Sequence, residues 1–173
     1  MQPMIDKLVS VYRDTVRPRM QDLSVYNAAL QVEARGFMLR DGQCSGVLIT
    51  PWCMNLVLLP VDGDSWVGLP PGSRVEAVFP AGTYLLTLSL PAGSEPHLCL
   101  TLFTTVLAFP HQDMARQVAD EVLRRMYLET SQPEYGGTDP LNARLDREEA
   151  RGPLSRRDLL HGRWTRAAAP VRR

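Results

Sequence analysis

The spacing of apolar residues predicts one helix near the N-terminus and another near residue 120. Five apolar positions recur at intervals of three and four, which is typical of an amphipathic helix: Ile5, Leu8, Val9, Tyr12 and Val16. Pro3 suits the first turn of this helix, and Pro18 is expected to end or kink it. Residues 111–129 return to the same period through Met114, Val118, Val122 and Met126, which predicts the second helix.

Between these helices the apolar pattern changes to a period of two or to short continuous runs, both typical of strands. Segments of this kind lie at residues 28–36, 46–50, 54–59, 73–79, 83–90 and 97–105. The runs at 46–50 and 54–59 are apolar enough for the centre of a sheet. We therefore expect an α+β fold, with a mainly antiparallel sheet of about five strands and both helices packed on one face.

Beyond residue 130 the apolar period is lost. Residues 131–152 are polar and contain Pro133, Gly136, Gly137 and Pro140, which is the composition of a linker. The sequence therefore predicts a globular domain over residues 1–130, followed by a linker and an extended C-terminal tail over residues 131–173. Charge follows a related division: residues 1–150 carry a net charge of −6, and residues 151–173 carry +6.

Composition and charge exclude several classes of protein. The formal net charge of zero disfavours nucleic-acid binding, which normally relies on a basic domain. No apolar stretch is long enough to span a bilayer, and Asp6 and Lys7 interrupt the region where a signal peptide would be apolar. Three cysteines (Cys44, Cys53 and Cys99) form no paired spacing, so we expect buried thiols and a cytoplasmic protein.

The chain carries no recognisable catalytic or metal-binding motif. It contains no GxSxG, phosphate-binding glycine loop, HExxH or CxxC sequence. His97 and Cys99 share one face of a predicted strand, but no third group is at hand to orient a catalytic dyad, so packing is the favoured interpretation. The other cysteines and histidines are too dispersed for a structural zinc site. We therefore expect a non-enzymatic protein with no cofactor and no metal.

Residues 49–60 are the most unusual segment of the chain. Pro51 separates two strand-like runs, and the resulting kink places Trp52 and Met54 either beside the sheet edge or in the core under a bend. The first arrangement gives an apolar groove for a peptide, with Thr50 and Asn55 as its polar groups. The second is ordinary core packing, which is the more common outcome for such residues.

The tail contains the sequence SRRDLLH, which has the form S-R-R-x-(F/L)-L of a twin-arginine export motif. Its residues are Ser155, Arg156, Arg157, Leu159 and Leu160. It does not suit an export signal, because it lies near the C-terminus and four arginines follow it instead of a hydrophobic region. Two interpretations remain: a solvated basic tail, or an imitation of a signal peptide that occupies a site made for one.

The runs VEARGF, GVLITPWCMNLVLLP, FPAG and CLTLFTTV, with Trp66 and an ending of the form RRxLLxGR, resemble the HybE/HupJ family of nickel–iron hydrogenase assembly chaperones. The resemblance covers about residues 5–164. The residues that match its most specific motif are Thr50, Pro51, Trp52, Met54 and Asn55. Members linked to a rubredoxin have paired CxxC ligands, and this chain has none, so no iron centre is implied.

The resemblance implies a cytoplasmic accessory chaperone that binds the hydrogenase small-subunit precursor at its twin-arginine signal region. Such a chaperone would aid assembly with the large subunit, which is a further candidate partner, before export. Arginine pairs bidentately with carboxylates, so the site needs acidic residues: Asp62 and Asp64 are the nearest candidates, with Glu33 and Glu76 as further ones. One alternative is a scaffold that shields a hydrogenase subunit or its metal clusters from oxygen without recognising a signal peptide. Another is an enzyme that uses Cys53 or Cys99.

Overall fold

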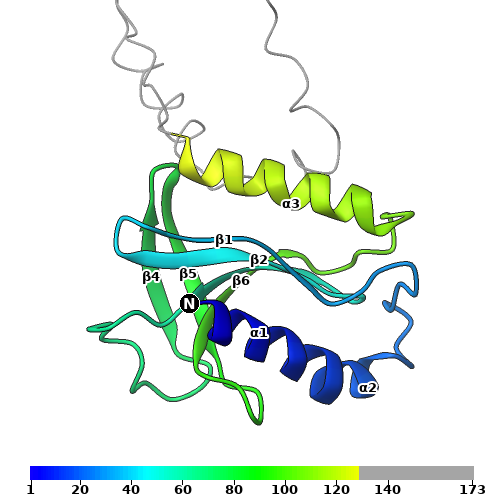
Figure 1. Ribbon diagram of the computed structural model, residues 1–173, viewed down its shortest axis with the longest axis horizontal. Coiled ribbons are helices and arrows are strands. Elements are labelled where there is room, and N and C mark those ends of the chain that lie inside the picture. Colours follow the sequence, from blue (N-terminus) through cyan, green and yellow to red (C-terminus); the bar gives the residue numbers. More distant parts are fainter. Residues whose placement is uncertain (129–173) are drawn as a thin grey trace, which may run out of the picture. The chain divides into compact units, whose positions relative to one another are not determined.

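A computed structural model of the chain describes residues 1–128, which form a six-stranded sheet with helices (Figure 1). The strands are β1 (Glu33–Arg40), β2 (Gln43–Ile49), β3 (Met54–Leu59), β4 (Arg74–Phe79), β5 (Gly82–Ser89) and β6 (His97–Phe103). Their order in the sheet is β1-β2-β3-β6-β5-β4, and all five pairings are antiparallel. The predicted α+β class and antiparallel sheet are confirmed, with six strands instead of about five.

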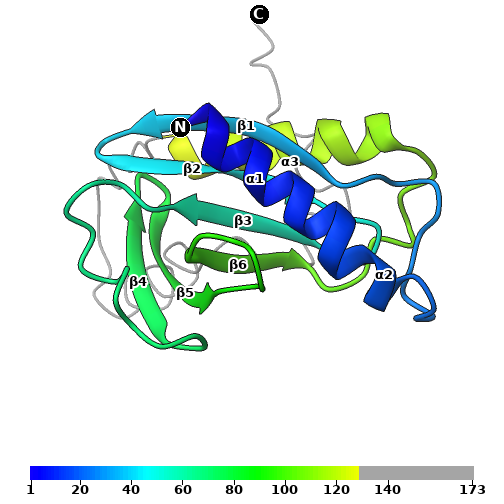
Figure 2. The same cartoon turned by 60° about the horizontal axis from the view of Figure 1, so that its bottom comes forward.

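The two helical regions lie on opposite faces of the sheet, so the prediction that both pack on one face is wrong (Figures 1 and 2). On β2, Cys44 packs in the cluster beneath the N-terminal helix, whereas its neighbour Ser45 bonds to the hydroxyl of Tyr127 in the C-terminal helix. Adjacent residues of a strand point to opposite faces. The physical reason is the composition of β2 and β3, which is apolar at odd and even positions alike and therefore needs cover on both sides.

The N-terminal helical segment consists of α1 (Gln2–Val11), a π-helical turn η1 (Tyr12–Val16) and α2 (Arg17–Met20). The segment continues past Pro18 because this proline occupies the first turn of α2, where its missing N–H is not needed. The wide turn η1 precedes it. Ile5, Leu8 and Tyr12 form the buried side of this segment and pack against the sheet.

The C-terminal helix α3 (Gln112–Tyr127) begins at His111, whose Nδ1 accepts a hydrogen bond from the backbone N–H of Met114 at 3.2 Å. Its buried stripe is Ala115, Ala119, Val122, Leu123 and Met126. The two alanines replace the predicted Met114 and Val118 in that stripe, and Met114 is 39 % exposed. The helix also approaches β1 closely at Gly36, which has a φ of +63° and lies directly under Leu123. A side chain at this position would be strained and crowded.

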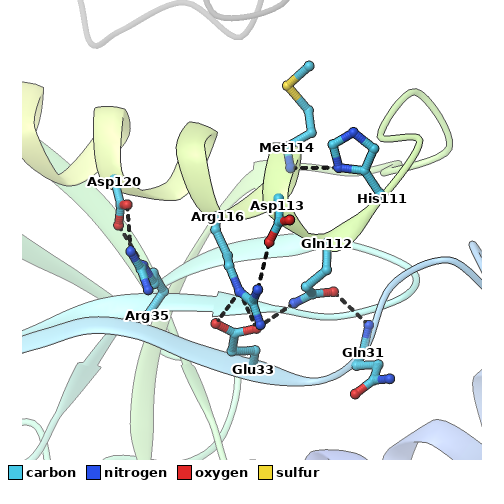
Figure 3. A network of polar contacts seen from close by, with 9 residues as sticks. All are labelled: Gln31, Glu33, Arg35, His111, Gln112, Asp113, Met114, Arg116 and Asp120. Atoms are coloured by element: carbon cyan, nitrogen blue, oxygen red, sulfur yellow. Dashed lines mark hydrogen bonds and ion pairs between the residues drawn. The ribbon is translucent and has the colours of Figure 1, made fainter.

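A polar network fastens α3 to the edge strand β1 (Figure 3). Arg35 donates two hydrogen bonds to the carboxylate of Asp120, at 2.7 and 2.8 Å. Glu33 accepts from Arg116 at 2.9 Å and from the side-chain amide of Gln112 at 2.7 Å. Glu33 and Arg35 therefore have a structural role, because both hold α3 against β1.

Residues 129–173 lie outside the described part of the chain. The predicted linker and tail over residues 131–173 fall there, and so do Ser155, Arg156, Arg157, Leu159 and Leu160. The division into a domain and a tail therefore stays a prediction. Among residues 1–128, no helix has both the length and the apolar character needed to cross a membrane.

Candidate functional site

Residues 50–53 form the turn between β2 and β3, and Thr50 holds that turn together. Its Oγ1 accepts a hydrogen bond from the backbone N–H of Cys53 at 3.0 Å and donates one to the carbonyl of Cys53 at 2.8 Å. The carbonyl of Pro51 accepts from the backbone N–H of Asn27 at 2.7 Å. Threonine and proline thus suit the local geometry: the hydroxyl of Thr50 closes the turn, and the ring of Pro51 supplies a fixed φ.

The motif residues are brought together, but as a buried turn. Thr50 and Met54 have no exposed surface, Trp52 is 6 % exposed and Asn55 is 8 % exposed. Trp52 packs in the cluster formed with Leu8 of α1. Because β2 and β3 are neighbours in the middle of the sheet, the kink does not lie at a sheet edge as the first interpretation required. The alternative of core packing therefore describes these side chains, and their binding role stays a prediction.

A buried pair beside this cluster was not found from the sequence. The hydroxyl of Tyr12, in η1, lies 3.1 Å from Nε2 of His97, and Nδ1 of His97 lies 2.9 Å from the carbonyl of Glu95. The carbonyl can only accept, so Nδ1 carries the proton, and Tyr12 donates to Nε2. Burial lowers the pKa of His97 and raises the pKa of Tyr12. The one signal for this pair in the sequence was His97 itself, a histidine at the start of an otherwise mainly apolar strand.

The thiols are not arranged for nucleophilic chemistry. Burial raises the pKa of Cys99 to about 12, and burial also raises the pKa of Cys53, although its sulfur accepts a hydrogen bond from Asn55 and shares another with the hydroxyl of Thr50. A thiol with a raised pKa holds little of the reactive thiolate at neutral pH. His97 bonds to Tyr12 and the backbone, which removes it from the conceivable dyad with Cys99. Within residues 1–128, no group of three or more His, Cys, Asp or Glu side chains is placed to hold a metal ion.

The candidate carboxylates do not share one environment. Asp64 caps its own loop, since its Oδ2 accepts from the backbone N–H of Val61 at 2.8 Å. Glu33 is committed to Arg116 and Gln112. Asp62 and Glu76 are exposed and have no partner among the described residues. Of these four candidates, Asp62 and Glu76 are therefore the exposed carboxylates available to a ligand, and Asp64 is half-buried.

Asp62 and Asp64 lie at the opposite end of β3 from the Thr50–Asn55 motif. The motif ends in the first two residues of this strand, Met54 and Asn55, whereas Asp62 and Asp64 follow its last residue, and a strand of six residues spans about 20 Å. Residues near in sequence are therefore separated in space. They form two distinct features: a buried turn at one end, and an acidic loop, residues 60–73, at the other.

The acidic loop combines carboxylates with exposed apolar side chains. Val67 and Leu69 are 41 % and 43 % exposed, while Trp66 is buried and anchors the loop. No lysine or arginine occurs between residues 41 and 73. Residues 1–128 carry 10 basic and 12 acidic side chains, so their net charge is only −2, and any attraction for a cationic ligand is local to this loop.

Comparison with known proteins identifies relatives over most of the chain. The family model of the NiFe-hydrogenase assembly chaperone HybE matches residues 3–162. The hydrogenase expression/formation protein HupJ of Bradyrhizobium diazoefficiens is 32 % identical over 160 residues, covering 92 % of this chain and 88 % of that protein. A probable rubredoxin HupJ of Rhodobacter capsulatus is 34 % identical over 124 residues, 69 % of this chain, and the match spans only 45 % of that relative.

The fold has a counterpart among solved structures. The solution structure of HybE from Escherichia coli superposes with a TM-score of 0.58 at 21 % identity, covering 79 % of this chain and 87 % of that one. At this identity the match concerns the fold alone.

Proposed function

Because the chain belongs to the HybE family of NiFe-hydrogenase assembly chaperones, we propose that it binds the hydrogenase small-subunit precursor at its twin-arginine signal region. Bound in this way, the precursor is held in the cytoplasm for assembly with the large subunit before export. The proposal assigns no catalytic step and no cofactor to the chain. The raised pKa values of Cys53 and Cys99 support a non-enzymatic role, because they keep both thiols protonated at neutral pH.

The acidic loop carries this proposal. A twin-arginine segment presents guanidinium groups followed by apolar residues, and the loop presents Asp62 and Asp64 followed by exposed Val67 and Leu69. Arginine favours carboxylates because its planar guanidinium donates two parallel hydrogen bonds. The absence of basic residues over positions 42–73 leaves this attraction uncompensated.

The motif residues Thr50, Pro51, Trp52, Met54 and Asn55 enter the proposal as supporting residues. Their side chains are buried, so their contribution to partner binding is to fix the β2–β3 turn and the packing of α1 on which the surface rests. The tail motif Ser155, Arg156, Arg157, Leu159 and Leu160 repeats the chemistry of the precursor signal. We propose that this segment competes with the precursor for the same site.

Co-precipitation from cells tests the function. The tagged chain is expressed beside the small-subunit precursor with or without its signal segment, and bound subunit is quantified. We expect recovery of the full precursor and at least a tenfold loss without the signal. Asp62→Asn is expected to weaken recovery, while Asp41→Asn, an exposed aspartate of the β1–β2 turn, serves as the matched control. Equal recovery with and without the signal contradicts the proposal and favours the oxygen-shielding scaffold.

A further inference from the structure

Within residues 1–128 the sheet has one open edge. Strand β4 ends the strand order and pairs only with β5, and Figure 2 shows it at the outer side of the sheet. The other edge, β1, has an irregular register between Arg35 and Met38 and is bridged to α3 (Figure 3). Such irregularities and side-chain covers protect edges from further pairing. Among the described residues nothing comparable covers β4.

The backbone groups that face this edge follow from the pairing of β4 with β5. The N–H of Leu88 donates to the carbonyl of Ser73 at 2.8 Å, so Ser73 faces β5 just before β4 begins. Hydrogen-bonding direction alternates along an antiparallel strand. Val75 and Ala77 therefore also bond toward β5, and three residues direct their N–H and C=O groups outward: Arg74, Glu76 and Val78.

The same three residues have exposed side chains on one face of the sheet. Val78 is 68 % exposed, and neither Arg74 nor Glu76 forms an ion pair with any described residue. Leu85 of β5, directly opposite Glu76, is 47 % exposed and extends the apolar surface. Charged side chains on an edge discourage indiscriminate pairing, and this edge presents a cation, an anion and an apolar side chain in order. Such an order selects a complementary strand.

We propose that the open edge of β4 binds the twin-arginine segment of the hydrogenase precursor as an added parallel strand. This inference rests on the function proposed above and names the place and mode of binding. Main-chain hydrogen bonds to an edge strand supply affinity in this mode, and alternate side chains supply specificity.

The register follows from the form S-R-R-x-L-L of the motif. In a parallel strand, placing the second arginine beside Glu76 brings the leucine two positions later beside Val78. The serine two positions earlier then lies beside Arg74, where a small polar side chain causes no repulsion. Opposite charges and apolar pairs across strands each stabilise a sheet. The acidic loop leads into β4 at Arg74, so the amino-terminal side of the peptide lies at the end of β4 that follows this loop.

Amide hydrogen exchange of the full chain tests the mode of binding. The probe is a synthetic peptide containing Ser-Arg-Arg-Ala-Leu-Leu, added to saturation. We expect the N–H groups of Arg74, Glu76 and Val78 to exchange at least tenfold more slowly with peptide. Those of Val75 and Ala77, already bonded to β5, should change little. Bound peptide without this alternating protection overturns the edge site but leaves the proposed function intact. Failure of the peptide to bind overturns both.

Two substitutions test the site by affinity, measured by fluorescence anisotropy of the labelled peptide. Val78→Pro removes an outward N–H while sparing the β4–β5 ladder, and we expect about a tenfold loss of affinity at unchanged melting temperature. Thr83→Ala, on β5 opposite Val78, is the control and should bind normally.

Charge exchange tests the register. Glu76→Arg should weaken binding of the probe, and replacing the second arginine of the probe by glutamate should restore it. Replacing the first arginine instead should give no rescue. Equal rescue by both altered peptides overturns the register, and no effect of Glu76→Arg or Val78→Pro overturns the site.

Discussion

Trp52→Ala separates the core interpretation of the family motif from the groove interpretation. The side chain is 6 % exposed and packs with Ile5, Leu8 and Tyr12 beneath the N-terminal helix. A buried aromatic side chain of this size removes up to about 250 Å² from water, worth about 6 kcal/mol at 25 cal/mol per Å². The alanine retained and the compactness of the unfolded chain reduce this figure, and measured truncations of Trp cost about 3–5 kcal/mol.

Urea denaturation followed by far-ultraviolet circular dichroism measures this cost. A domain of this size has a free energy of unfolding of about 5–15 kcal/mol, so a loss of about 3–5 kcal/mol moves the midpoint far toward low urea. Trp52→Phe is the matched control, because it keeps an aromatic ring in the cluster and should cost clearly less. A loss below about 1 kcal/mol for Trp52→Ala would refute the reasoning, since it would mean that the ring contributes little to the core.

The same variant has a second readout in binding. If Trp52 acts through the core alone, the folded fraction of Trp52→Ala should bind precursor peptide with the affinity of the native chain. Weak binding at unchanged stability would show direct contact between Trp52 and the partner, contrary to its burial.

Two further predictions concern pH and the tail. Burial holds the pKa of His97 below its ordinary value of 6.5. As pH falls, this histidine therefore takes up a proton in the unfolded chain before it does so in the folded chain. The free energy of unfolding should therefore fall as pH drops below about 6.5. His97→Gln should flatten this slope in denaturation curves recorded between pH 7.5 and 5. A chain ending at Thr130 should keep cooperative unfolding, because the apolar periods end before that residue. A melting temperature lower by ten degrees or more would place the tail in the core.

Most of the fold could be predicted from periodicity. The six strand-like runs correspond to the six strands, and the helix predicted over residues 111–129 is α3 at Gln112–Tyr127. The prediction that both helices pack on one face was wrong because an apolar run without alternation does not indicate the face of the sheet to which each side chain points. In β2, Cys44 packs beneath the N-terminal helix, whereas Ser45 bonds to the C-terminal helix. Only the tertiary structure separates them.

The candidate site was less predictable, for reasons of geometry. Pro51 correctly marked a break between two strands, but their central position in the sheet depends on β6 pairing with β3 from forty or more residues away. Asp62 and Thr50 are near in sequence and lie at opposite ends of β3. The open edge at β4 is a property of strand order, which no local pattern in residues 74–79 reveals.

Calorimetric titration of the purified chain with the purified small-subunit precursor tests the central claim most directly. The account predicts one-to-one binding to the precursor, with affinity falling at least tenfold when the two arginines of its signal are replaced by glutamine. Because the attraction involves carboxylates and guanidinium groups, the difference should be larger at low salt. Equal affinity for the two precursors at both salt concentrations would contradict the account.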